Sequence, residues 1–133
     1  MEKIEHIGIA VKDLAVSNKL FASLFGKEHY KEEEVASEGV KTSFFKSGPN
    51  KIELLQATDA ESPIAKFIEK KGEGVHHIAF AVLDIKAEIK RLKTAGFIIL
   101  NETPKKGADN KLVAFLHPKT TNGVLIELCQ EIE

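Results

Sequence analysis

Residues 4–11 are rich in isoleucine and valine, and larger apolar residues alternate with small ones at positions 7, 9 and 11. This period of two is typical of a β-strand with one buried face. After Asp13 the period lengthens to that of a helix, which ends at Gly26. Asp13 is a suitable N-cap and Gly26 a suitable C-terminal stop. The apolar residues at helical spacing are Leu14, Leu20, Phe21, Leu24 and Phe25.

Three more strands are predicted in the first half of the chain, near residues 28–34, 40–47 and 50–56. A Ser-Gly-Pro-Asn turn at residues 47–50 separates the last two. A short linking helix is predicted over residues 62–71, because a serine and a proline open it and Gly72 follows it.

The second half of the chain repeats the first. The block His6-Ile-Gly-Ile-Ala-Val returns as His77-Ile-Ala-Phe-Ala-Val, offset by 71 residues. The block Ile-Glu53-Leu-Leu-Gln returns as Ile-Glu127-Leu-Cys-Gln, offset by 74 residues. Two matching blocks in the same order indicate an internal duplication. The larger second offset predicts a three-residue insertion in the second copy, most simply in a hairpin loop.

The repeat predicts the same elements again: a strand over 76–82, a helix from its cap Asp84 to Gly96, and strands near 97–102, 111–117 and 123–130. The expected fold class is therefore α+β, with two tandem βαβββ modules over about 1–58 and 74–133. We expect the modules to pair into one sheet-lined metal cavity within a single domain, residues 1–133.

Strand parity places the candidate chemistry, because successive side chains of a strand point to opposite faces. His6 and His77 lie opposite the apolar faces that the helices are expected to cover. Glu53 and Glu127 each stand between two apolar neighbours, so they share the faces of the histidines. Pairing of the two halves would bring all four side chains together. We predict a metal site formed by His6, Glu53, His77 and Glu127.

Physical chemistry supports this prediction. Burying an unpaired carboxylate costs several kcal/mol, and a divalent cation compensates for that cost. Two imidazoles and two carboxylates suit zinc, cobalt, nickel, manganese or ferrous iron. Four protein ligands also leave positions open on a six-coordinate ion. The other interpretation is that these are polar residues that face solvent from half-buried strands. It would be the better explanation for any single one of the four residues, but it does not explain why the set is duplicated.

Composition narrows the class of protein. The 133 residues are 43% hydrophobic and carry a net charge of −1, with no cluster of lysine and arginine that would favour nucleic acid or a membrane surface. No apolar run is long enough to span a bilayer, and no signal peptide is evident. A single cysteine, Cys129, excludes an internal disulfide, so we expect a reduced, cytoplasmic setting.

These motifs resemble the vicinal oxygen chelate superfamily, which includes glyoxalases, bleomycin resistance proteins and dioxygenases. Four blocks are similar to its methylmalonyl-CoA epimerases: Ser62–Phe67, Gly74–Ala79, Phe115–Lys119 and Gly123–Leu128. The resemblance implies a homodimer that binds a divalent ion (cobalt, zinc, nickel or manganese) and an acyl-CoA thioester. It implies the same four metal ligands, with Glu127 as a proton carrier. Glu127 and Glu53 are the candidate catalytic carboxylates.

The second proton carrier is where the sequence departs from the epimerases. Some of them have a glutamate three residues after the glycine that matches Gly39, and this chain has Thr42 there. A threonine hydroxyl does not take a proton at neutral pH. Glu38, Glu53 or a bound water are the alternatives that the sequence leaves open.

Three other functions are alternatives. A glyoxalase I-type lactoylglutathione lyase would use the same ligand set, but its usual arginines after the first helix are replaced here by Lys27-Glu-His-Tyr30. An extradiol dioxygenase would need two histidines, one carboxylate and twice as many modules. A non-catalytic small-molecule binder of the drug-resistance kind would not be expected to retain all four ligands.

Three further residues have a simpler interpretation than a role in the site. His76 has the parity opposite to His77 and is predicted to be structural. His117 is predicted to satisfy a loop, and Cys129 to be buried and inert. Four lysines are candidates for the phosphates of coenzyme A: Lys105, Lys106, Lys111 and Lys119.

Overall fold

The computed structural model describes all residues, Met1–Glu133. They form two compact units. We call residues His6–His76 the first unit, and residues Met1–Glu5 with His77–Glu133 the second unit. Strands β1 (Ile4–Ala10) and β5 (Gly74–Ala81) each contain residues of both units.

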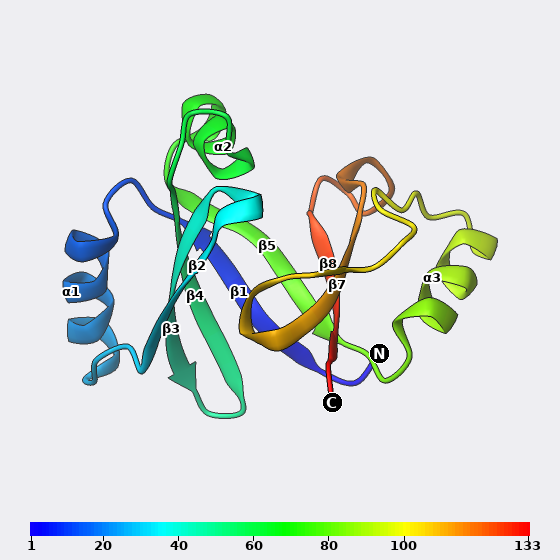
Figure 1. The fold of residues 1–133 in the computed structure, drawn as a ribbon, viewed down its shortest axis with the longest axis horizontal. Helices are drawn as coiled ribbons and strands as arrows, with labels where there is room; N and C mark the ends of the chain where they lie inside the picture. Colours follow the sequence, from blue (N-terminus) through cyan, green and yellow to red (C-terminus); the bar gives the residue numbers. More distant parts are fainter. The chain divides into compact units, whose positions relative to one another are not determined.

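In the first unit, the strand order is β2-β3-β4-β1, with β2 at Lys31–Val35, β3 at Val40–Ser47 and β4 at Asn50–Ala57. Neighbouring strands β2, β3 and β4 are antiparallel, and β4 runs parallel to β1. Helix α1 (Leu14–Phe25) lies along this sheet at its β3 and β4 strands (Figure 1). This unit reproduces the predicted βαβββ order.

Helix α1 begins and ends as its sequence predicts. The Asp13 side chain accepts a hydrogen bond from the backbone N–H of Val16, and Gly26 closes the helix in the left-handed conformation, at φ 73°. The buried face packs Leu14, Phe21 and Phe25 against Val11, Phe45 and Leu54. The other two predicted apolar positions, Leu20 and Leu24, are 64% and 69% exposed.

Helix α2 (Pro63–Lys71) begins at Ser62, whose hydroxyl accepts a hydrogen bond from the backbone N–H of Ile64. It packs Ile64, with Phe67 and Ile68, against Ala10 and Leu55. Ala10 and Leu55 share the sheet face of His6, so α2 covers one end of this face. The sequence did not predict this cover. The apolar cluster that α2 forms does not include His6 or Glu53.

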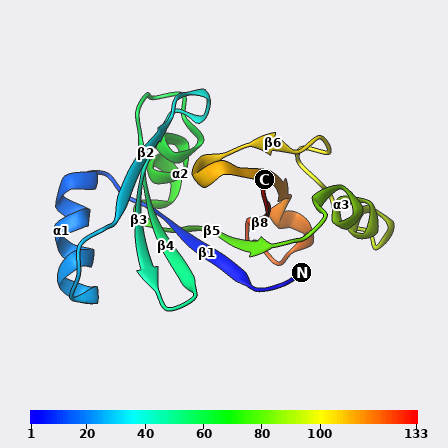
Figure 2. The same ribbon diagram turned by 60° about the horizontal axis from the view of Figure 1, so that its bottom comes forward.

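In the second unit, the strand order is β5-β8-β7-β6, with β6 at Lys105–Lys106, β7 at Lys111–Leu116 and β8 at Ile126–Glu131. Helix α3 (Ile85–Thr94) is capped by Asp84 and packs Ile85, Ile89 and Leu92 into the core (Figure 2). A smaller apolar cluster on the opposite face contains Ala79, Val113 and Cys129. The face alternation predicted for this half is therefore confirmed.

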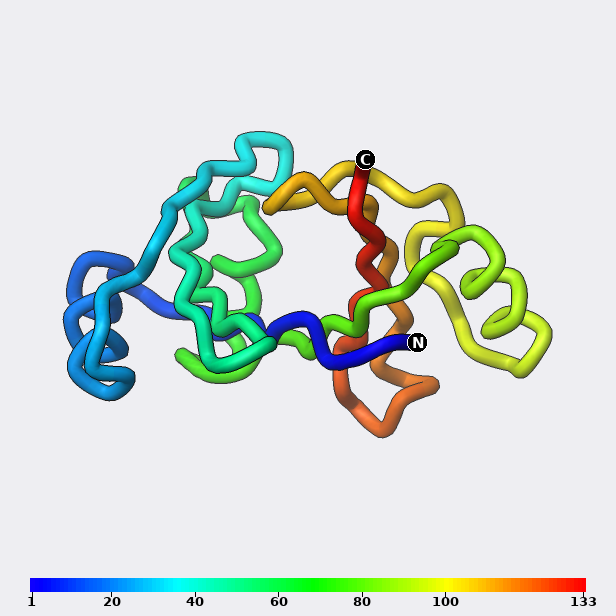
Figure 3. The backbone as a smooth tube through the Cα atoms, turned by 90° about the horizontal axis from the view of Figure 1, so that it is seen from below, coloured from blue at the N-terminus to red at the C-terminus, as the bar shows by residue number.

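The N-terminal residues belong to the second unit, although they come first in the chain. The backbone N–H of Glu2 donates to the carbonyl oxygen of Ala81 at 2.8 Å, and the N–H of Ala81 donates to the carbonyl of Lys3 at 2.9 Å. In Figure 3 the start of the chain runs beside the end of β5. Residues 1–5 thus continue the sheet of the second unit.

The predicted strand at residues 97–102 is wrong. Only an isolated bridge, Ile99 to Leu116, forms there, and β6 is two residues long. At residue 101 the Asn101 side chain, and not its backbone, makes the hydrogen bonds to β7. Its Oδ1 accepts from the N–H of Phe115 at 2.9 Å and its Nδ2 donates to the carbonyl of Val113 at 3.1 Å. Pro104, which has no N–H to donate, then follows. The strand predicted at 28–34 also shifts, because β2 begins at Lys31.

The predicted insertion is confirmed, and its position is clear from the strand register. Phe44 pairs with Glu53 across the β3–β4 turn, whereas Phe115 pairs with Glu127 across the β7–β8 connection. The second loop is therefore three residues longer, and it contains the short helix Pro118–Thr120. No helix in the protein is both long enough and apolar enough to cross a bilayer.

Candidate metal centre

The first unit contains a buried histidine–carboxylate pair. His6 on β1 is 5% exposed and Glu53 on β4 is 4% exposed. Gly8 is the strand partner of Glu53, which places His6 diagonally beside Glu53 on the same face. His6 Nδ1 lies 3.1 Å from Glu53 Oε2. Because Gly8 has no side chain, it leaves space next to the carboxylate.

The second unit repeats this arrangement. His77 on β5 is 5% exposed and Glu127 on β8 is 6% exposed. Ala79 is the strand partner of Glu127, as Gly8 is of Glu53. His77 Nε2 lies 3.2 Å from Glu127 Oε1. Each unit therefore presents one imidazole and one carboxylate from neighbouring parallel strands, with a small residue between them.

Both pairs fit a divalent ion. Typical ligand distances of about 2.0–2.2 Å from an ion to nitrogen or oxygen put adjacent ligand atoms roughly 3 Å apart. The two nitrogen–oxygen separations, 3.1 and 3.2 Å, have that value. The donor set of neutral imidazole and carboxylate suits zinc and its neighbours in the first transition row. The sharing of one ion by the two pairs remains a prediction.

Glutamines tie both pairs to the helices. Gln56 follows Glu53 by three residues, and its Oε1 accepts a hydrogen bond from the N–H of Leu14 at 2.6 Å. Gln130 follows Glu127 by three residues and accepts from the N–H of Ile85 at 2.7 Å. Each strand that carries a candidate carboxylate ligand is thus hydrogen-bonded to the first turn of its own unit's helix.

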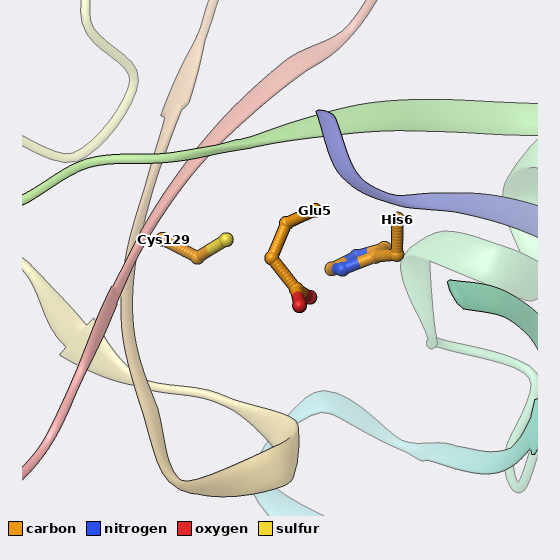
Figure 4. Close-up of side chains that lie close together, drawn as sticks. All are labelled: Glu5, His6 and Cys129. Carbon is orange, nitrogen blue, oxygen red and sulfur yellow. The ribbon is translucent and has the colours of Figure 1, made fainter. Parts of the chain in front are cut away.

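Glu5 is a buried carboxylate that the sequence analysis missed. It is 5% exposed, and its carboxylate lies within 4.8 Å of Cys129 Sγ in the second unit, as Figure 4 shows. Cys129 is 2% exposed and its thiol contacts the carbonyl oxygen of Phe80 at 3.6 Å. The one available signal was an acidic residue inside an otherwise apolar strand.

The other singled-out histidines have structural surroundings. The His76 ring meets Phe67 edge-on, with ring centroids 4.9 Å apart. Burial, with a smaller contribution from the charge of Lys71, lowers the pKa of His76 to about 4, so its imidazole is neutral at neutral pH. His117 Nδ1 accepts a hydrogen bond from the N–H of Lys119 at 3.0 Å and caps the short helix of its loop.

The lysines proposed for coenzyme A differ in accessibility. Lys105, Lys106 and Lys119 are exposed. Lys111 is 7% exposed, and its Nζ lies 3.2 Å from Glu131 Oε1. Lys111 therefore already has an ionic partner and is buried, whereas the side chains of the other three lie at the surface.

Thr42, at the position where the sequence departs from the epimerases, is 1% exposed. Its strand partner is Leu55, so its side chain shares the face of Glu53. The Thr42 hydroxyl is buried and has no hydrogen-bond partner. Glu38, one of the alternative proton carriers, lies in the short helix Ala36–Glu38 that precedes β3.

Known proteins share this fold and these motifs along nearly the whole chain. The ethylmalonyl-CoA/methylmalonyl-CoA epimerase of Cereibacter sphaeroides is 42% identical over 130 residues, 96% of this chain and 97% of that protein. The uncharacterized protein YqjC of Bacillus subtilis is 36% identical, over 98% of this chain and 93% of that protein. A solved methylmalonyl-CoA epimerase in complex with methylmalonyl-CoA and NH4+ is 34% identical, with a TM-score of 0.94, and the match covers 98% of this chain and 95% of that one.

A family model also matches the chain, and this match does not depend on any single relative. The model that describes the glyoxalase, bleomycin resistance protein and dioxygenase group matches residues 5–115, which include His6, Glu53 and His77. The α+β architecture with βαβββ units agrees with it. The chain belongs to the Glyoxalase/Bleomycin resistance protein/Dioxygenase superfamily.

Proposed function

We propose that the protein is a metal-dependent epimerase that inverts C2 of methylmalonyl-CoA. The observation that carries the proposal is the pair of buried histidine–carboxylate contacts in a chain that is 34–42% identical to methylmalonyl-CoA epimerases along its length. A solved relative was obtained with methylmalonyl-CoA, which makes an acyl-CoA thioester the expected substrate class here.

In this proposal His6, Glu53, His77 and Glu127 hold one divalent ion. When bound, such an ion acts as a Lewis acid that stabilises the negative charge developing on a thioester oxygen. The two imidazoles bind it as neutral nitrogen donors. The two carboxylates offset its charge, and their burial at 4% and 6% exposure keeps water away from the ligand set.

In this proposal, carboxylates of the chain itself transfer the protons. C2 lies between a thioester and a carboxylate, so removal of its proton produces an enolate. Inversion then requires a proton to leave from one side of C2 and another to arrive on the opposite side. Glu127 is the proposed carrier on one side. Glu53, at the matching position of the other unit, is proposed to act mainly as a ligand.

Deuterium exchange tests the proposal. Metal-loaded protein is incubated with one epimer of methylmalonyl-CoA in deuterated water, and C2 is followed by NMR or mass spectrometry. We expect deuterium uptake with inversion in the native protein, and loss of uptake in Glu127→Gln. The matched variant Glu53→Gln keeps a ligand oxygen at its position and is expected to retain measurable exchange.

Two other outcomes would replace the proposal. If C2 of neither epimer exchanges but the methylglyoxal–glutathione adduct is turned over, the protein is a lactoylglutathione lyase. If neither substrate reacts and the protein only binds small molecules, it is a non-catalytic member of the superfamily.

A further inference from the structure

Helix α1 of the first unit carries large apolar side chains on the side that does not pack against its sheet. Val16, Leu20 and Leu24 are 64%, 64% and 69% exposed. They follow one another at intervals of four residues, so they lie along one side of the helix. The residues that α1 packs into the core, such as Leu14 and Phe21, belong to its opposite side. We call Val16, Leu20 and Leu24 the α1 stripe.

No element of the first unit covers the α1 stripe. In Figures 1 and 2 the side of α1 that faces away from β3 and β4 is open. A surface helix normally carries charged and polar residues on that side. Lys19 is the only charged residue of α1, and the helix has no acidic residue in its first turn and no basic residue in its last turn. A contiguous apolar patch of a few hundred Å² marks an interaction site on a protein surface.

The second unit shows that the fold itself does not require this stripe. Asp84 caps α3 as Asp13 caps α1, so the two helices align with the offset of the internal repeat. The positions that match the α1 stripe are Ala87, Arg91 and Ala95, and all three are exposed. Small and charged residues therefore serve a helix at this place in the fold. The large apolar residues are special to α1, which indicates that they have a partner outside the unit.

The α1 stripe is complementary to itself. Consider two molecules of the chain whose α1 helices pack antiparallel around a twofold axis through Leu20. Residues that lie equally far before and after Leu20 then meet across the axis. Val16 of one molecule meets Leu24 of the other, and Leu20 meets Leu20. Side chains spaced four residues apart form the ridges that commonly pack between helices.

The charged residues at the two ends of the helix are complementary in the same arrangement. Lys12 and Asp13 precede α1, whereas Lys27 and Glu28 follow it, and all four are exposed. Around the same twofold axis Lys12 meets Glu28 and Asp13 meets Lys27, so both pairs have opposite signs. A parallel arrangement would bring like charges together. Antiparallel packing also sets the positive end of one helix dipole beside the negative end of the other.

We infer that the α1 stripe is the surface through which two molecules of this chain pair, as an antiparallel, twofold helix pair. The inference does not depend on the proposed function, and it gives the expected homodimer a specific surface and geometry. The same surface is used on both molecules, so the assembly closes at two. Because the stripe is smaller than the roughly 800 Å² per partner of a standard interface, the pairing should be reversible and should depend on protein concentration.

Sedimentation equilibrium of the full-length protein, over concentrations that reach the millimolar range, tests the inference. The native mass should rise toward twice 14.7 kDa. Leu20→Arg copies Arg91 of α3, so it suits the helix, but it sets two positive charges against each other at the twofold axis. It should raise the dissociation constant by at least about 100-fold. The control is Leu83→Arg, which changes a leucine that is 81% exposed outside the stripe, and it should stay within about threefold of native.

A mixture of two variants tests the twofold geometry. Leu20→Arg and Leu20→Glu should each be monomeric alone, but together they should form a one-to-one pair, because only then do opposite charges meet at the axis. Circular dichroism should show the native helix content in both variants. The inference is overturned by a native protein that stays monomeric, by native-like pairing of Leu20→Arg, or by a mixture that stays monomeric. If a monomeric native protein instead binds phosphatidylglycerol vesicles and Leu20→Glu does not, the stripe contacts a lipid surface.

Discussion

At the scale of single residues, Gln56 and Gln130 make the same contact in both units: each accepts a hydrogen bond from the first N–H of its unit's helix. Replacing either by alanine leaves that N–H without its acceptor. We expect Gln56→Ala and Gln130→Ala each to lower the free energy of unfolding by about 1 kcal/mol. Urea denaturation should show a lower midpoint with an unchanged m-value.

The matched control for this prediction is Gln56→Glu. It keeps an acceptor oxygen and adds a negative charge at the helix N-terminus, which is a favourable position for an anion. Its stability at neutral pH should equal or exceed that of the native protein. A loss as large as that of the alanine variant would mean that packing of the side chain, and not its hydrogen bond, stabilises the helix.

Single-residue reasoning from the sequence placed some residues correctly and missed others for a physical reason. Parity within a strand was enough to put His6 with the small residues Gly8 and Ala10, and Glu53 between apolar neighbours. Which residues of β2 share the face of Glu53 depends on how neighbouring strands are aligned, and one residue of slip would turn them to the other face. The sequence carries no direct signal for that alignment.

At the scale of secondary structure, the Asn101 side chain makes hydrogen bonds to β7 that the backbone of a neighbouring strand would otherwise make. Its amide accepts from Phe115 N and donates to the Val113 carbonyl. Its Nδ2 also donates to the carbonyl of Thr103 at 3.3 Å. Asn101→Ala removes all three hydrogen bonds, and we expect it to cost roughly 1–3 kcal/mol, because the backbone groups of Phe115 and Val113 are partly buried. Hydrogen exchange at the amide of Phe115 should accelerate in parallel with the fall in stability.

The variant Asn101→Asp separates the accepted hydrogen bond from the donated ones. It keeps the acceptor for Phe115 but loses the donor to Val113 and Thr103, so its effect on stability should lie between those of the native protein and of Asn101→Ala. Equal losses in both variants would assign the whole effect to the donated hydrogen bonds. The strand near 97–102 was predicted from the internal repeat, because the first copy has a strand at the matching place. A side chain that takes over backbone hydrogen bonds leaves no periodic pattern in the sequence, so this difference between the copies could not be predicted.

At the scale of the whole molecule, the duplication predicts how the protein responds to metal. If one ion is shared by the two pairs, titration should saturate at one ion per chain. An ion at 100 times its dissociation constant should stabilise the fold by about 2.7 kcal/mol and raise Tm by roughly 10 °C. A chelator should reverse the shift, as followed by differential scanning calorimetry.

Variants in each unit test the sharing directly. His6→Ala and His77→Ala should each abolish the Tm shift, because each removes a ligand from the same ion. Two independent sites would behave differently: each variant would then halve the number of ions bound and leave the other site intact. The sequence predicted the duplication well, because both blocks repeat in order. It did not predict that the boundary between the units falls inside β1 and β5.

That boundary has a consequence for the order in which the chain is made. Residues Met1–Glu5 are made before the first unit, but their backbone partner is Ala81, in the second unit. The first unit, His6–His76, is continuous and is complete in the nascent chain before that partner exists. Since domains generally fold as units during synthesis, we expect residues Met1–Glu5 to remain without this partner until residue 81 has emerged from the ribosome. Nascent chains stalled just before and just after that point should differ in protease sensitivity at the N-terminus.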